Sequence, residues 1–140
     1  MNDAAENHRP IFAELQVFPA GQSVAVDVTL SLAGQVVTSR AEGSGDERGV
    51  ARTAAEAVLD TLEAFLNGVV ELELAWFKVL EPEGHFGHTV VHCAVAAKTE
   101  RGRELYVGSA LSRGDLSVAA VRSALDAMNR PFARMRNGYL

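Results

Sequence analysis

The sequence predicts an α+β fold made of two tandem strand-strand-strand-helix repeats, each with an antiparallel sheet and one helix, related by a pseudo-twofold axis. Three observations predict this fold. Apolar and polar residues alternate through the first third of the chain, the apolar spacing then changes to that of a helix, and the same order recurs in the second half.

The first half begins with three segments that have the periodicity of strands. Apolar and polar side chains alternate over residues 11–18 and, most regularly, over Ser23–Leu32, which is typical of half-buried strands. Ala33-Gly34 suits a tight hairpin turn, because glycine tolerates a positive φ. We therefore expect a third strand at Gln35–Ala41.

A helix is predicted from about Arg48 to Leu66, where apolar residues recur every three or four positions. Asn67-Gly68 can end it, because either residue can adopt the left-handed conformation that closes a helix.

The second half repeats this order, with strands expected at 69–80, 89–95 and 103–111. A second helix follows, which Asp115 or Ser117 can cap and which Pro131 is expected to end. One face of the strand at 69–80 is predicted to carry Leu72, Leu74, Trp76 and Leu80.

The two predicted helices align directly, and two pairs of identical residues are 66 positions apart (125 − 59 and 126 − 60). The matching residues are Ala54, Leu59 and Asp60 in the first helix and Ala120, Leu125 and Asp126 in the second. The predicted organisation is a flexible tail at 1–10, repeats at 11–68 and 69–131, and a C-terminal tail at 132–140.

Composition favours a single domain of 140 residues with 48% hydrophobic residues. A net charge of -5 with scattered basic residues argues against nucleic acid as the partner, and no stretch reaches the ~20 apolar residues of a membrane span. The single cysteine, Cys93, and an N-terminus unlike a secretory signal predict a cytoplasmic protein. The exposed edges of the sheets predict a homodimer.

Two stretches carry a resemblance to a known family. Leu105–Ala110 followed by Ala119–Arg130, and Ala41–Asp46 followed by Ala54–Leu59, resemble the C-terminal allosteric domain of 2-isopropylmalate synthase, and the resemblance covers residues 12–130. It implies a duplicated unit that dimerises and binds an end-product amino acid, leucine in that family, near the loops before the helices.

The chain also departs from that family. The charged run Asp46–Arg48 lies where the family has a shorter and less charged loop, so the resemblance does not carry leucine over as the ligand. The family's catalytic barrel is not part of this sequence, so we expect a stand-alone domain, either a small-molecule sensor or a descendant that kept only the dimer fold.

The loop Gly43-Ser44-Gly45-Asp46 precedes the first helix and is the first candidate ligand site. Amides at a helix N-terminus can hold a carboxylate or a phosphate. The alternative is turn chemistry, in which Asp46 and Glu47 cap the helix and complement its dipole.

The corresponding loop of the second repeat contains Ser112, Arg113 and Asp115. Arg113 can pair with a ligand carboxylate. A polar loop with a helix cap at Asp115 explains these residues equally well, and the two loops support each other as sites because a pseudo-twofold fold gives them related surroundings.

No metal site, cofactor or catalytic set is predicted. His85, His88 and His92 fall on a hairpin and a strand, where His88 and His92 lie about 13 Å apart, too far to share one ion. No nucleophile motif surrounds any serine, and Cys93 lies among valines. The sequence therefore favours a non-catalytic regulatory or sensor domain that binds a small polar metabolite at a dimeric interface; the alternative is a ligand-free protein-protein interaction module.

Overall fold

A computed structural model describes residues 9–81 and 87–137 and confirms the α+β fold of two repeated units. The first unit consists of β1 (Ile11–Ala20), β2 (Ser23–Leu32), β3 (Gln35–Ser44) and α2 (Glu47–Phe65). The second unit consists of β4 (Glu71–Leu80), β5 (Thr89–Thr99), β6 (Gly102–Ser112) and α3 (Leu116–Arg136). The three strands of each unit form an antiparallel sheet in chain order.

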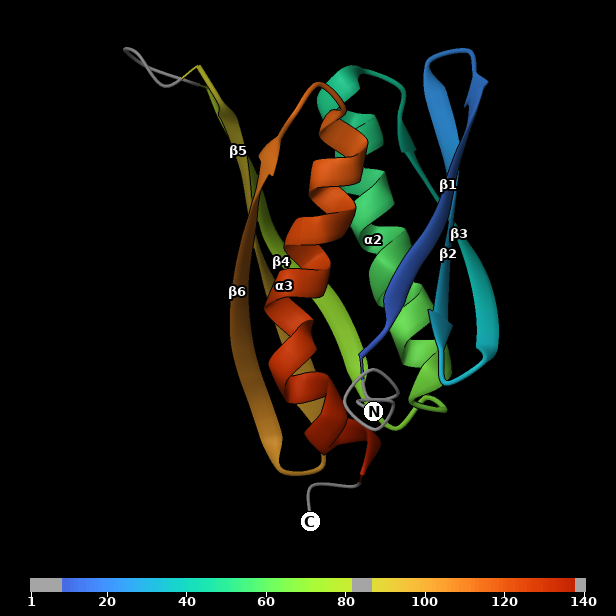
Figure 1. Cartoon of the computed structure of the whole chain (residues 1–140), viewed down its shortest axis with the longest axis vertical. Coiled ribbons are helices and arrows are strands. Elements are labelled where there is room, and N and C mark those ends of the chain that lie inside the picture. The colour runs from blue at the N-terminus through green and yellow to red at the C-terminus, as the bar shows by residue number, and fades with distance from the viewer. Residues whose placement is uncertain (1–8, 82–86, 138–140) are drawn as a thin grey trace, which may run out of the picture.

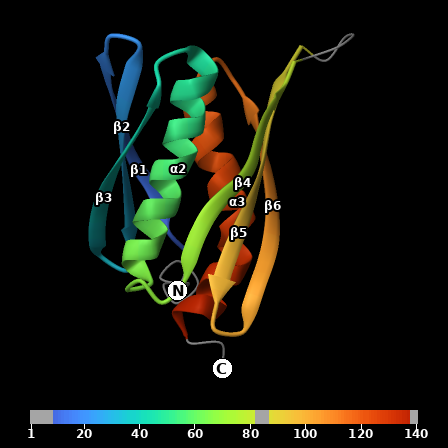
Figure 2. The same cartoon turned by 180° about the vertical axis from the view of Figure 1, so that it is seen from behind.

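The two helices lie side by side between the two sheets (Figures 1 and 2). α2 packs on β2 and β3 of its own sheet and on β4 of the other, while α3 packs on β5 and β6 and touches β1. Each sheet therefore has an inner face against the helices and an outer face directed away from them.

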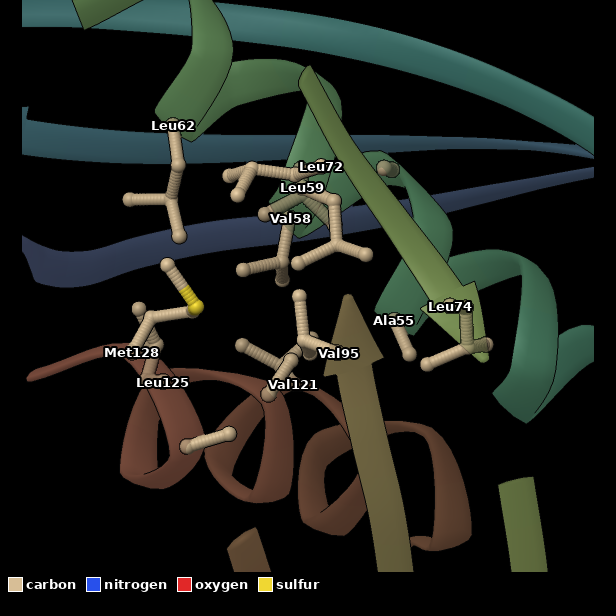
Figure 3. Packing of buried hydrophobic residues seen from close by; sticks show 14 of the residues in the cluster. Ala55, Val58, Leu59, Leu62, Leu72, Leu74, Val95, Val121, Leu125 and Met128 are labelled. Carbon is tan, nitrogen blue, oxygen red and sulfur yellow. The ribbon is translucent and has the colours of Figure 1, made fainter. Parts of the chain in front are cut away.

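One hydrophobic core fills the helix layer and joins the two units. Leu62 of α2 points toward Met128 of α3, and Val58 of α2 points toward Val121 of α3 (Figure 3). Leu72 of β4 lies on the α2 side of these contacts. All five side chains are at most 8% exposed. Neither helix could bury this surface without the other unit.

The pattern of burial supports the internal repeat. Ala54, Ala55, Val58 and Leu62 of α2 are fully buried, and so are the residues 66 positions later, Ala120, Val121, Ala124 and Met128. The alignment also shows a difference at the start of the helices: α3 begins at position 116, which corresponds to 50 (116 − 66), whereas α2 begins at 47. The first helix therefore has almost one additional turn at its N-terminus.

The predicted turns are present. Ala33 and Gly34 both have positive φ, at 52° and 86°, in the hairpin between β2 and β3. Asn67 and Gly68, at 55° and 73°, follow the end of α2, where left-handed residues close a helix.

The predicted face of β4 is wrong beyond Leu74. The pairing of β4 with β5 shifts register between Leu74 and Trp76, which leaves Ala75 as an extra residue. Such a bulge inverts the alternation of side chains. Trp76 and Leu80 consequently lie on the outer face, and Phe77 packs against the core instead.

β1 has a matching bulge between Phe12 and Glu14. Phe12 and Leu15 therefore pack against the core, whereas Ile11 is exposed, although the sequence places Ile11 on the same face as Leu15.

The second helix does not end at Pro131, as the sequence predicts, but continues to Arg136 with the proline inside it. Proline removes one helical hydrogen bond at a cost of about 3 kcal/mol. Phe132 and Met135 are 0% and 3% exposed, and each contributes about 1.5–3 kcal/mol by burial, which offsets that cost. Phe132 and Met135 are thus part of the core, and residues 132–136 belong to the helix and not to a tail. Residues 1–8 and 138–140 of the expected tails lie outside the described residues.

Gly108 of β6 permits the close contact between that strand and α3. A Cβ at this position would lie 2.2 Å from the Ser123 carbonyl oxygen and 2.4 Å from the Ala127 amide nitrogen. We predict that Gly108→Ala lowers the free energy of unfolding by about 1–3 kcal/mol, because backbone atoms must move apart. Urea denaturation measures the change. Ser109→Ala, on the exposed outer face, is the control and should change stability by less than about 0.5 kcal/mol.

Candidate functional site

The two candidate loops lie at the same end of the molecule, because both helices begin there (Figure 1). Gly43 and Ser44 are the last residues of β3, and Asp46 is the N-cap of α2. Ser112 ends β6 in the same way, and Asp115 is the N-cap of α3.

The first loop is closely packed on its own helix. The amide of Gly45 donates to the carbonyl of Gln22 over 2.9 Å, and a Cβ on Gly43 would collide with the Thr53 hydroxyl. The small residues of this loop therefore permit close contacts within the chain. This finding favours the turn-chemistry interpretation for Gly43 and Gly45.

The carboxylate of Asp46 lies at the start of α2. The hydroxyl of Ser44 donates to it, and this hydrogen bond holds the pKa of Asp46 below its usual value, with help from the nearby Gly49 amide and the Arg48 guanidinium. A carboxylate here also complements the helix dipole. The helix N-terminus is therefore already occupied by an ionised side chain of the protein itself.

A cavity of about 390 Å³ opens beside this loop, between the first turns of α2 and the last residues of β4. Asp46, Arg48, Gly49 and Arg52 line it from the helix side, and residues 77–80 line it from the strand. The volume is in the range of small-molecule sites. Three of the residues that line it are basic: Arg48, Arg52 and Lys78.

Each of these basic side chains has only weak partners among the residues that the structure describes. Arg48 pairs with Glu81 at 2.9 Å, with both side chains more than half exposed, and Arg52 approaches Glu56 at 3.9 Å along the helix. Lys78 lies over the Trp76 ring, 5.6 Å from its centroid. Exposed pairs of this kind contribute about 0–1 kcal/mol, so an anionic ligand can take over these contacts at little cost.

The second loop lines a smaller cavity of about 200 Å³ together with Val118, Ala119 and Arg122. Arg113 and Asp115 both belong to its wall, but Asp115 also accepts a hydrogen bond from the Val118 amide at 3.1 Å as the helix cap. This cavity shares no lining residue with the first. The fold thus brings the two loops to one end without joining them into one site.

Sequence reasoning missed Arg52, Lys78 and Phe77 as residues of the first cavity. Arg48 and Arg52 are four positions apart on a predicted helix, a spacing that puts both on one face. That signal was available in the sequence. The position of Lys78 depends on how β4 packs on α2, and no local pattern indicates it.

The remaining candidate residues are the histidines and Cys93, and the described ones form neither a metal site nor a reactive nucleophile. Among residues 9–81 and 87–137, no three His, Cys, Asp or Glu side chains gather where they could hold a metal ion; His85 lies outside these ranges. Cys93 is fully buried, and burial raises the pKa of its thiol. A buried thiol that stays protonated is a poor nucleophile.

A comparison with models of protein families gives no match for this sequence, and a comparison with curated proteins gives none either. In the described part of the chain, no helix combines the length and the apolar character needed to cross a membrane.

The Asp46 carboxylate should make stability depend on pH. A carboxyl group whose pKa is lower in the folded state stabilises it above the unfolded pKa of about 3.9, and this contribution is lost as the pH falls through the folded pKa. We predict that Asp46→Asn is less stable than the wild type at pH 7 and that the difference shrinks below about pH 4. Urea denaturation of both proteins from pH 7 to below about pH 4 measures the difference in their free energies of unfolding. A difference that stays constant with pH would contradict the role given to the charge of Asp46.

Proposed function

We propose that this chain is a non-catalytic regulatory or sensor domain that binds a small anionic metabolite in the cavity between α2 and β4. One observation carries the proposal: three basic residues, Arg48, Arg52 and Lys78, are among those that line one cavity. Guanidinium groups in particular favour carboxylates and phosphates.

The cavity also has an apolar wall, formed by Phe77, Val79 and Leu80 of β4. Small-molecule sites combine such walls with a few charged groups that orient the ligand. This combination supports a ligand with one anionic end and a short apolar body, such as an amino acid or a 2-oxo acid.

The charges of the cavity support binding rather than acid-base catalysis. Its carboxylate, Asp46, has a lowered pKa and stays ionised near neutral pH, whereas a general acid or base works best with a pKa near the operating pH. Arginine side chains remain charged in proteins. The buried thiol of Cys93 fits the reducing cytoplasm that we propose as its location.

We propose that the active form is a homodimer. Lys78 and Leu80 line the cavity and also lie on the outer face of their sheet. A second copy packed on this outer face would therefore border the cavity, and the ligand would bind beside a dimeric interface.

A screen of amino acids, 2-oxo acids and nucleotides by thermal shift tests the ligand. At about 100 times its dissociation constant, a ligand that binds only the folded state stabilises it by about 2.7 kcal/mol, which corresponds to a rise in Tm of about 8 °C for a chain of this size. We predict that at least one anionic compound produces such a rise.

Variants of the two cavities locate the site. Arg52→Ala combined with Lys78→Ala should abolish the rise, while the control pair in the second cavity, Arg113→Ala with Arg122→Ala, should preserve it. Loss of the response only in the control pair would place the ligand in the second cavity. No response to any compound would overturn the metabolite proposal and favour the ligand-free interaction module.

A further inference from the structure

Five cross-strand rows make up the outer face of the sheet β4-β5-β6. Two of them are apolar, and the polar row of Lys78, His92 and Ser109 lies between these two. Of the ten large apolar side chains that are exposed among the described residues, five lie on this face: Trp76, Leu80, Leu105, Val107 and Leu111. The pairing register puts them in rows, with Trp76 and Val107 on either side of Ala94, and with Leu80 and Leu111 on either side of Val90. Exposed apolar side chains that gather on one face among polar residues mark interaction sites.

The equivalent face of the sheet β1-β2-β3 is different. Its central rows are polar, and their side chains satisfy one another: Thr29 and Thr38 share a hydrogen bond at 2.7 Å, and Arg40 pairs with Asp27 at 2.6 Å. The two units have the same fold, so the fold itself does not require an apolar outer face. Ile11, Phe18 and Val36 are exposed toward the two ends of this face. Only the second sheet has rows that are apolar across all three strands, which indicates that a partner covers that sheet.

Charged residues lie at one end of the outer face of the second sheet, with opposite signs on its two edges. Glu71 and Glu73 lie on the edge strand β4, and Arg103 lies on the other edge strand, β6. Lys98 lies between them on β5, next to Glu71 and Arg103 in the register. If a second copy faces the first after a twofold rotation, the acidic edge of one copy lies against the basic edge of the other.

We propose that a second copy of this chain covers this face, with a twofold axis parallel to β5 between the two sheets. This rotation keeps every row at the same height and sets β4 of one copy over β6 of the other. Trp76 then packs on the partner's Val107, Leu80 on the partner's Leu111, and Glu71 lies opposite the partner's Arg103. The two Lys98 side chains meet near the axis, each beside its own Glu71. The two apolar rows therefore face their like and Glu71 faces an opposite charge, as a twofold interface favours. In the other two rows Lys78 lies opposite the partner's Ser109, and Glu73 lies opposite the partner's Leu105.

The area of the face agrees with a dimer of moderate affinity. Nine residue steps from Glu71 to Leu80 span about 30 Å, and three strands with their flanks span about 15 Å, which gives about 450 Å² on each copy. Two copies bury about 900 Å² in projection, and more when the relief of the side chains is included, which is near the lower limit for specific interfaces. We expect dissociation in the micromolar range.

This inference rests on the homodimer of the proposed function but not on its ligand, so the two are tested separately. Analytical ultracentrifugation of the full chain without added ligand, from about 1 µM to about 1 mM, measures the dimer. Val107→Asp should weaken it by about tenfold or more, because it buries a charge in the middle row of the face. The matched control is Val36→Asp on β3, since Val36 is 66% exposed and Val107 is 57% exposed.

An exchange of charges tests the proposed axis. Glu71→Arg and Arg103→Glu should each weaken the dimer, because each places like charges opposite one another, and the double variant should restore it. Circular dichroism checks that every variant keeps its fold.

Four outcomes are decisive. Weakening by Val107→Asp but not by Val36→Asp, with rescue by the double charge exchange, supports the proposal. A monomeric wild type at every concentration overturns both this interface and the homodimer. A dimer that tolerates Val107→Asp overturns the face alone. A dimer that Val107→Asp disrupts but that the double exchange does not restore overturns the axis. The thermal-shift screen is a separate measurement, and none of these four outcomes decides whether a metabolite binds.

Discussion

The whole structure depends on the contact between α2 and α3. A helix on the surface of a globular protein buries one apolar stripe, but α2 buries ten of its nineteen residues and α3 buries eleven of its twenty-one, because each packs on its own sheet, on the other helix and on an edge strand of the other sheet. Alanines such as Ala54 and Ala120 are fully buried there and let the layers approach closely. Three strands and one helix could not bury this surface alone, so the two repeats form one cooperative core.

The sequence predicted the strands and helices correctly where the spacing of apolar residues is regular. The alternation from Val24 to Leu32 is strict because alternate residues face a helix, and the helical spacing in α2 is equally clear. The sequence could not reveal the bulges at Ala13 and Ala75, because one extra residue leaves no mark on hydrophobicity while it moves every following side chain to the other face. The prediction that α3 ends at Pro131 was wrong for the opposite reason. Proline is a strong local signal for the end of a helix, but the burial of Phe132 outweighs its cost.

The candidate site was also predictable from the sequence only in part. Both loops before the helices could be found from the sequence, since each joins a strand to a helix and ends in an N-cap aspartate, Asp46 or Asp115. The cavity itself could not be found, because its second wall is β4, which begins 24 residues after the first helix starts (71 − 47) and reaches α2 only through tertiary packing. Its three basic residues form a cluster only in the folded chain.

Duplication explains why the two halves share a fold, but the features that suggest function lie where the halves differ. The additional turn at the start of α2 carries Arg48 and brings it to the cavity beside β4, whereas α3 begins later, and the cavity beside its first turns is the smaller one. The outer sheet faces also differ: the central rows of the first are polar and their side chains pair with one another, whereas the second has two apolar rows, one of which contains Trp76. Lys78 connects these two differences, because it lines the cavity and lies on the outer face of the second sheet. A core shared by both repeats thus constrains the inner faces to remain alike, while the surfaces that face away from it are free to specialise.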